Sequence, residues 1–250
     1  MLLDHRWRRW RARWARAVPA LCEACGRWPD GPLCPTCQRD LAPLMPRCPR
    51  CALPRPAEVP FCASCLGREA PPWTQVLARV DYAPPWDAWV AALKFRGRLG
   101  LAAPLARLWL DDPALDALLR GCDVWLPIPL APRRLAERGY NQVWALMQAL
   151  AAWRPTPCAW PTALQRRDDA PAQHRLDRAQ RLAQAPQLFA LDAHAAHRIR
   201  GCHVLVVDDV MTTGATLQAA SAVLLAAGAR AVSALVLART PRPGSPASME

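Results

Sequence analysis

The sequence predicts an α/β protein in which a mostly parallel sheet, flanked by helices, follows a small cysteine-rich segment. Two observations carry this prediction. Apolar, strand-like runs alternate with helical segments between residues 73 and 240, a pattern typical of a parallel sheet covered on both faces. Four CxxC pairs lie within the first 65 residues. The 250 residues of the chain suffice for one full core and a small second domain.

Local sequence signals mark where several of the helices begin and end. Pro113 follows an acidic helix start, Gly121 marks the end of the same helix, and Gly228 is expected just after the last helix. The strand-like runs are residues 74–82, 122–130, 202–209 and 231–239, and the helical segments are residues 84–95, 101–110, 111–121, 141–153 and 216–228.

The chain divides into four parts. They are a basic arm rich in Trp and Arg (1–20), a cysteine-rich segment (21–72), an α/β domain (73–240) and a disordered tail (241–250). In the arm, Trp7, Trp10 and Trp14 form one stripe of a helix, with arginines on the remaining faces. Such a helix either packs against protein or contacts nucleic acid or a membrane surface.

Composition and charge predict where the protein is located in the cell and which class of partner it binds. No apolar run approaches the roughly 18 residues that a membrane span needs. The basic N-terminus leads into cysteines instead of an apolar signal segment, so a cytoplasmic location is expected. The net charge of +12 favours a polyanionic partner, such as nucleic acid or a phosphorylated ligand. Lys94 is the only lysine, which hints that a compact ammonium group is needed there.

The cysteine pairs predict metal binding. One CxxC pair places two thiolates on a tight turn, and two such pairs complete a tetrahedral site. Eight cysteines therefore suit two structural zinc ions, with the pairs used either in sequence order or crossed. Disulfides fit a secreted protein better, and an iron–sulfur cluster is a further alternative. The expected metal ligands are Cys22, Cys25, Cys34, Cys37, Cys48, Cys51, Cys62 and Cys65.

The stretch "VLVVDDVMTTGAT" at residues 204–216 carries the main functional signal. A nucleoside-triphosphatase strand would need a lysine-bearing phosphate loop elsewhere, and "ALKFRG" around Lys94 does not match one. Taken as one unit, Asp208 and Asp209 lie at the carboxyl edge of a sheet, where ligands bind. They can accept hydrogen bonds from ribose hydroxyls or help to hold magnesium. The turn that follows, with Gly214, would cup a phosphate at a helix start.

This stretch resembles the motif of type I phosphoribosyltransferases that binds phosphoribosyl pyrophosphate (PRPP). Together with "LKFRG", "PIPLAPRRLAERGYNQ" and the cysteine pairs, it resembles the ComF/GntX family of phosphoribosyltransferase-like proteins, from about residue 20 to residue 240. The resemblance implies a type I phosphoribosyltransferase fold with a double zinc ribbon. It also implies that PRPP binds with magnesium and that phosphoribose passes to an unidentified acceptor.

The resemblance further implies roles for individual residues. The implied catalytic residues are Lys94, Arg138, Asp208 and Asp209. The implied PRPP contacts are Asp208, Asp209, Val210, Met211, Thr212, Thr213, Gly214, Ala215, Thr216, Pro127, Arg133, Arg134, Asn141 and Gln142. Residues 166–185 stand where related enzymes have a mobile loop, with Gln173, Arg178 and Arg181 as candidates. Ala183 departs from the family pattern, in which an asparagine often stands.

Three functions remain as hypotheses. The chain is an enzyme that transfers phosphoribose from PRPP, a single-stranded-DNA-binding protein on the same fold without turnover, or a zinc-stabilised scaffold. ComF relatives are linked to DNA uptake in natural competence, so the DNA-uptake machinery is an expected partner. A basic protein gains salt-sensitive affinity for DNA by counterion release alone, so DNA binding by itself does not discriminate among the three.

Overall fold

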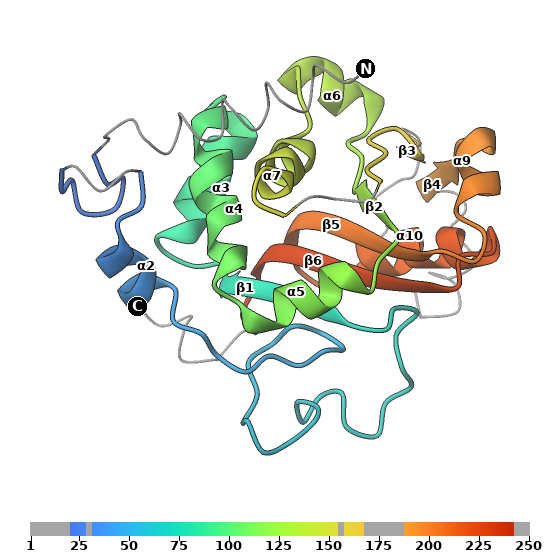
Figure 1. Ribbon diagram of the computed structural model, residues 1–250, viewed down its shortest axis with the longest axis horizontal. Helices are drawn as coiled ribbons and strands as arrows, with labels where there is room; N and C mark the ends of the chain where they lie inside the picture. The colour runs from blue at the N-terminus through green and yellow to red at the C-terminus, as the bar shows by residue number, and fades with distance from the viewer. Residues whose placement is uncertain (1–20, 29–31, 155–157, 168–187, 243–250) are drawn as a thin grey trace.

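A parallel four-stranded sheet forms the centre of the molecule (Figure 1). The computed structural model describes residues 21–28, 32–154, 158–167 and 188–242; the Trp/Arg arm lies outside them. The strand order is β1-β6-β5-β2, and every neighbouring pair is parallel. The strands are β1 (Val76–Asp81), β2 (Val124–Pro127), β5 (His203–Met211) and β6 (Ala231–Arg239). The predicted fold class, a mostly parallel sheet flanked by helices, is confirmed.

Helices cover both faces of this sheet. In Figure 1, α3, α4 and α7 lie above the sheet, and their buried side chains join one hydrophobic cluster with those of α5. Side chains of α9 and α10 belong to a second cluster on the other face. The helices are α3 (Trp86–Phe95), the short η1 (Leu99–Leu101), α4 (Ala102–Leu110), α5 (Pro113–Arg120), α6 (Pro132–Arg138), α7 (Gln142–Ala151), α9 (Ala193–Arg198) and α10 (Ala215–Ala226).

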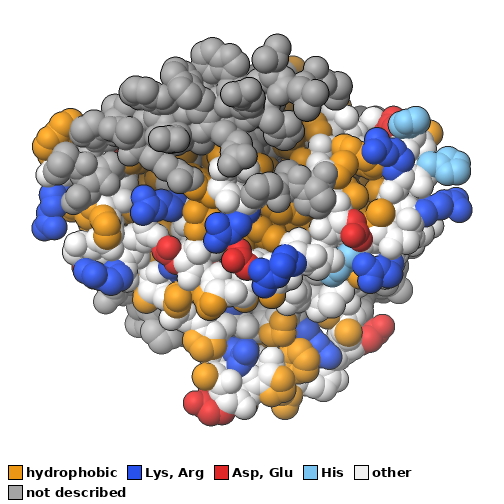
Figure 2. Space-filling view, viewed as in Figure 1, with side chains coloured by type: hydrophobic (Ala, Val, Ile, Leu, Met, Phe, Trp, Pro, Cys, Tyr) orange, Lys and Arg blue, Asp and Glu red, His pale blue; other side chains and the backbone are white. Residues whose placement is uncertain are grey.

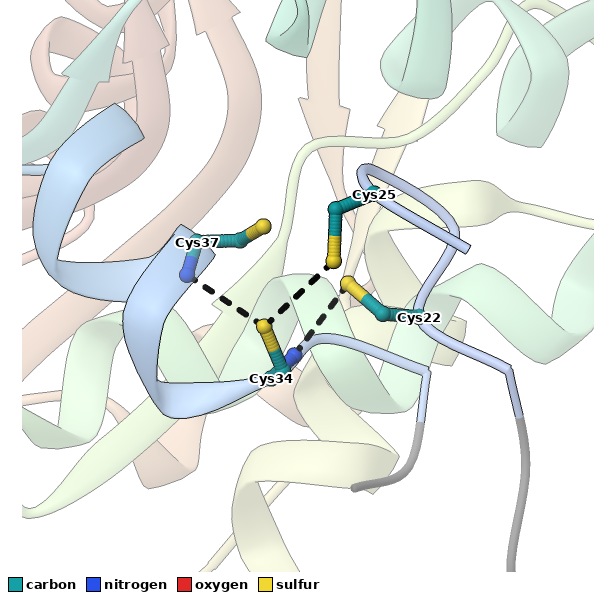
Figure 3. A group of neighbouring side chains, drawn as sticks. All are labelled: Cys22, Cys25, Cys34 and Cys37. Carbon is teal, nitrogen blue, oxygen red and sulfur yellow. Dashed lines mark hydrogen bonds between the residues drawn. The ribbon is translucent and has the colours of Figure 1, made fainter. Parts of the chain in front are cut away.

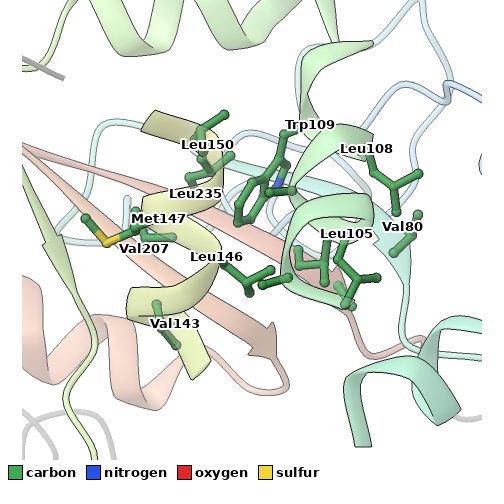
Figure 4. Close-up of a cluster of buried hydrophobic side chains, with 14 of the residues drawn as sticks. Val80, Leu105, Leu108, Trp109, Val143, Leu146, Met147, Leu150, Val207 and Leu235 are labelled. Carbon is green, nitrogen blue, oxygen red and sulfur yellow. The ribbon is translucent and has the colours of Figure 1, made fainter. Parts of the chain in front are cut away.

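Alternate side chains of the apolar strands belong to the two hydrophobic clusters on opposite faces of the sheet. Leu205 and Val207 of β5 pack with α4 and α7, where Trp109 is fully buried (Figure 4). Val204 and Val206, which point the other way, pack with α10. Since successive side chains of a strand face opposite sides, a strand buried on both faces has no polar alternation, as the sequence pattern predicted.

Capping residues explain where several helices begin and end. The side chain of Asp112 accepts a hydrogen bond from the backbone N–H of Ala114 at 2.9 Å and caps α5. Gly121 is the C-cap of that helix, and Gly228, with φ +97°, follows the end of α10 in the left-handed conformation. These three boundaries agree with the sequence prediction.

A small antiparallel pair was not predicted. It consists of β3 (Leu164–Arg166) and β4 (Phe189–Leu191). Each strand has three residues, which is too short for an alternation pattern to identify. Residues 168–187, which include Gln173, Arg178 and Arg181, lie outside the described residues.

The cysteine-rich segment contains one described helix, α2 (Pro35–Leu41). The cysteine-rich segment is attached to the α/β part by hydrogen bonds that backbone carbonyl oxygens of the segment accept. Nε1 of Trp86 donates to the carbonyl oxygen of Leu41 at 2.9 Å, and the N–H of Val76 donates to that of Pro49 at 2.8 Å. Among the described residues, no helix is both long enough and apolar enough to cross a membrane.

Candidate functional site

The eight CxxC cysteines gather into two groups of four. Within each group the four Sγ atoms all lie within 4.8 Å of one another, and in the first group they turn toward one another (Figure 3). The structure therefore uses the pairs in sequence order. All eleven cysteines of the chain are described and all are free thiols. Cluster 1 is Cys22, Cys25, Cys34 and Cys37, and cluster 2 is Cys48, Cys51, Cys62 and Cys65.

Both clusters are chemically suited to a metal ion. Four sulfur donors make a closed tetrahedral site of the structural type. The backbone supports the thiolate form in cluster 1, because the N–H of Cys34 points to Cys22 Sγ and that of Cys37 to Cys34 Sγ, both at 3.4 Å. Two cysteine tetrads that could hold metal ions are thus present.

One thiol in each cluster has a lowered pKa. Burial acts to raise the pKa of Cys22, but backbone N–H groups, led by that of Cys34, outweigh burial and lower the pKa to about 6. Burial also acts to raise the pKa of Cys62, but neighbouring thiols, led by Cys51, lower it to about 7. The thiolate is the form that binds metal, so each cluster has a starting ligand near neutral pH.

The two aspartates lie within β5, near its carboxyl end. The sequence pattern placed the end of this strand at Asp209, but pairing with β6 continues to Met211, which stands opposite Arg239. Both carboxylates are buried: Asp208 is 9% exposed and Asp209 is 4% exposed. The side chains of Val210 and Met211 pack against the two hydrophobic clusters, so these two residues contribute to the core.

Two side chains hold Asp209. Nζ of Lys94, near the end of α3, lies 2.7 Å from Oδ1 of Asp209. Nε2 of Gln142, the first residue of α7, donates to Oδ2 of Asp209 at 2.6 Å. Arg138 in turn donates to Oε1 of Gln142. Three segments that the resemblance singled out therefore meet at one buried carboxylate.

Asp208 lies in a less favourable setting for a negative charge. Burial, followed by the charge of Asp209, raises the pKa of Asp208 to about 8. Lys94, Arg166 and the backbone N–H of Asp209, which donates to Oδ1 of Asp208 at 2.9 Å, act in the opposite direction. A ligand that brings positive charge or hydroxyl donors would favour the ionised form.

The TTGAT loop (residues 212–216) connects β5 to α10. Gly214 precedes the helix with φ +85°. A Cβ at this position would lie 2.8 Å from Cε of Met211, the flexible end of that side chain, and 3.5 Å from Cη2 of Trp73, so the backbone conformation is the main reason for glycine here. Oγ1 of Thr213 accepts from the N–H of Ala215 at 3.3 Å. The first N–H groups of an α-helix have no partner within the helix and attract anions.

The segment between α6 and α7 is fixed by side-chain hydrogen bonds. Oδ1 of Asn141 accepts from the N–H of Val143 at 2.9 Å and caps α7. Nδ2 of Asn141 donates to the carbonyl oxygen of Ile128 at 3.0 Å, just beyond β2. The hydroxyl of Tyr140 donates to the carbonyl oxygen of Leu93 at 2.5 Å. The end of β2, where Pro127 is the last residue, is thereby joined to α7 and α3.

Arg133 and Arg134 of α6 face outward. Nε of Arg133 lies 3.0 Å from Oε1 of Glu137 in an exposed pair, and Arg134 is exposed. The guanidinium carbon of Arg138 lies 5.1 Å from the ring centroid of Phe95. Of the predicted basic residues, Lys94 and Arg138 join the buried network, whereas Arg133 and Arg134 lie on an exposed helix.

Two arginines that the sequence prediction did not assign lie close to this network. Burial, followed by the charge of Arg134, lowers the pKa of Arg166, and Asp208 acts to raise it. Arg239, the last residue of β6, is 7% exposed and donates from Nη1 to the carbonyl oxygen of Met211 at 3.0 Å. A charged residue at the end of an otherwise apolar strand was the sequence signal that could have identified Arg239.

Similarity to known proteins agrees with this arrangement. Residues 166–249 match the phosphoribosyl transferase domain family. DNA utilization protein YhgH of Salmonella typhimurium is 36% identical over 233 residues, which cover 89% of this chain and 98% of that protein. Competence protein F of Haemophilus influenzae is 30% identical over 184 residues, which cover 71% of this chain and 78% of that protein. The chain therefore belongs to the ComF/GntX family of phosphoribosyltransferase-like proteins.

Proposed function

We propose that the carboxyl edge of β5 and β2 binds PRPP. The observation that carries this proposal is the placement of Asp209, held by Lys94 and Gln142 and followed within three residues by the TTGAT loop. Carboxylates for hydroxyl groups and a helix start for a phosphate thus follow one another along the chain. A ribose 5-phosphate offers hydroxyls and a phosphate in the same order.

Each part of PRPP has a matching set of groups. The ribose hydroxyls would donate to Asp208 and Asp209, and the 5-phosphate would accept from the N–H groups and hydroxyls of the TTGAT loop. The pyrophosphate, with magnesium, would lie toward Lys94 and Arg138. Magnesium is usually held by one or two carboxylates and substrate phosphates, which the aspartates and PRPP would provide.

The reaction that this arrangement supports is transfer of phosphoribose. The bond between C1 of the ribose and the pyrophosphate oxygen breaks, and the electron pair leaves with pyrophosphate. A lone pair of the acceptor forms the new bond to C1, and the acceptor releases a proton. Lys94 and Arg138 would stabilise the charge that develops on the leaving group. This mechanism needs no nucleophilic side chain.

Zinc is the metal that the two cysteine tetrads fit best. Cysteine-only sites with two CxxC pairs are typical of structural zinc. Few side chains other than the cysteines are buried in the cysteine-rich segment. Metal binding would therefore contribute much of the free energy that orders this segment.

A role in DNA utilisation or uptake is proposed from the named relatives, a DNA utilization protein and a competence protein. A specific observation favours contact with single-stranded DNA. Phe95 is 73% exposed and lies between Lys94 and the exposed Arg96, with Arg138 near its ring. Exposed aromatic rings with arginines are stacking platforms for unpaired bases. Figure 2 shows Lys and Arg side chains spread across one face of the molecule.

Calorimetric titration of PRPP, with and without magnesium, tests the PRPP proposal. The wild type should bind, and Asp208→Asn/Asp209→Asn should not. Asp111→Asn/Asp112→Asn is a matched control, because it changes another adjacent pair of aspartates and Asn also caps helices. A wild type that gives no heat and no thermal shift with PRPP would refute the proposal.

A salt series with a short oligothymidylate tests the DNA proposal. Phe95→Ala should weaken binding by about 1–3 kcal/mol and leave the salt dependence unchanged. Arg96→Gln should reduce the slope of log K against log salt by about one. Leu44→Ala, which changes an exposed side chain of the cysteine-rich segment, is the control. Equal losses for Phe95→Ala and Leu44→Ala would remove the argument for stacking on Phe95.

A further inference from the structure

We propose that Arg239 is a positioning residue for the TTGAT loop and that metal-loaded cluster 2 holds Arg239 in place. This inference rests on the proposed binding of PRPP by that loop. It assigns cluster 2 a role beyond the folding of its own segment: occupancy of cluster 2 and binding of the PRPP 5-phosphate are coupled. Cluster 1 does not take part in this coupling.

The buried guanidinium of Arg239 joins the two sites directly. Nε donates to the carbonyl oxygen of Cys51, a cluster 2 residue, at 2.7 Å. Nη1 donates to the carbonyl oxygen of Met211 at 3.0 Å and to that of Thr240 at 2.7 Å. Met211 is the last residue of β5, so the loop begins at the next residue. A planar guanidinium with bonds to both backbones fixes their separation and orientation.

Trp73 makes a second connection between cluster 2 and the TTGAT loop. Nε1 of Trp73 donates at 3.1 Å to the carbonyl oxygen of Arg50, the neighbour of Cys51. The other end of the same indole ring lies beside Gly214, where Cη2 is 3.5 Å from the position that a Cβ would take. Trp73 is 8% exposed, so the ring packs between cluster 2 and the loop.

The two sites also share one cavity of about 220 Å³. Cys51 and Cys65 of cluster 2 line it, and so do Met211 and Thr213 at the end of β5 and in the loop, with Arg239 in the wall between them. A shift of cluster 2 on loss of metal would therefore reach the loop through the side chains of Arg239 and Trp73. Closely packed groups transmit such shifts because they do not deform continuously.

A comparable buried arginine near cluster 1 does not contact β5 or the TTGAT loop. Arg79 of β1 is 3% exposed. It donates to the carbonyl oxygens of Ala42 and Pro43, which follow α2, and to that of Leu108 in α4. None of these partners belongs to β5 or to the TTGAT loop. Arg79 is thus a control of similar burial: it donates to backbone carbonyls after α2 and in α4, lies 4.0 Å from Oδ2 of Asp111, and makes none of these contacts with cluster 2.

Substitution of the two arginines tests the coupling. Arg239→Met keeps an unbranched side chain that reaches as far as the Nε position and removes all the donors, and it should weaken PRPP binding about tenfold, within the usual range of coupling between sites. Arg239→Lys, which keeps one charged donor, should restore part of the affinity. Arg79→Met should leave PRPP affinity within about twofold of wild type, whatever it does to stability. Zinc content is measured for each variant by elemental analysis.

A variant Arg239→Met that keeps both metal ions and binds PRPP like the wild type would overturn the inference. It would leave the proposed function intact, because that function fails only if the wild type does not bind PRPP.

The second measurement does not alter Arg239. In Cys37→Ser, where only cluster 2 is complete, saturating PRPP should slow zinc release to a chelator several-fold. In Cys51→Ser, where only cluster 1 is complete, PRPP should have no effect. Equal release rates with and without PRPP in Cys37→Ser would also overturn the inference.

Discussion

At the residue scale, the candidate site places two carboxylates in a buried position with one ammonium in contact. Asp209 is paired with Lys94 at 2.7 Å. Asp208 accepts the backbone N–H of Asp209, and within the part of the chain that the structure describes no ion pair involves it. The pair is therefore asymmetric. Asp209 already has a cation and an amide donor in contact, whereas Asp208 would gain from a ligand that supplies such groups.

Lys94→Met should lower the free energy of unfolding by about 3 kcal/mol, because it leaves a buried carboxylate without its cation. Urea denaturation measures this loss. Arg133→Gln, which breaks the exposed pair with Glu137, should cost about 0.5 kcal/mol or less. Similar effects of the two substitutions would mean that the pair between Lys94 and Asp209 is no stronger than a surface pair.

Asp208→Asn should raise the stability of the ligand-free protein at pH 8. The pKa of Asp208 is raised to about 8 by burial and by Asp209, so between about pH 4 and pH 8 the folded state keeps a proton that the unfolded state has lost. Wild-type stability therefore falls as pH rises through this window. The difference in melting temperature between Asp208→Asn and wild type should grow from pH 5 to pH 8. A difference independent of pH would contradict this assignment.

At the element scale, the junction of β5 and α10 depends on one glycine. Gly214→Ala should destabilise the protein by about 1–2 kcal/mol from its left-handed backbone alone. It should also strongly weaken PRPP binding, because the strain falls in the loop that is proposed to hold the 5-phosphate. Gly201→Ala is the control, since Gly201 has φ +73° and nothing within 4 Å of the added carbon. It should cost stability and leave PRPP binding unchanged, as calorimetry and thermal melting would show.

The sequence predicted those elements whose signal is local. Continuous apolar runs identified β5 and β6, and cap residues such as Asp112 and Gly228 identified helix ends. The acidic pair and the TTGAT loop are contiguous, so their neighbourhood was visible without a structure. The contacts of Asp209 with Lys94 and Gln142 join residues far apart in the chain, and no local pattern encodes which side chains meet across a sheet edge.

At the scale of the whole molecule, two cysteine tetrads that could hold metal ions lie in a segment with little core of its own, which packs against an α/β unit. Elemental analysis should return about two zinc ions per chain. Chelation should make residues 21–72 sensitive to protease and lower the melting temperature, because metal binding supplies folding free energy. One ion per chain, or iron, would contradict the assignment of both clusters to zinc.

The single lysine of the chain has a practical consequence. Lys94 is the only side-chain amine in 250 residues, is 18% exposed and lies against Asp209. A reagent that acylates amines can therefore label this protein only at the N-terminus and at the candidate site. A single modified peptide in a mass spectrum would report whether the site is open, and its protection by a ligand would identify that ligand without knowledge of the reaction.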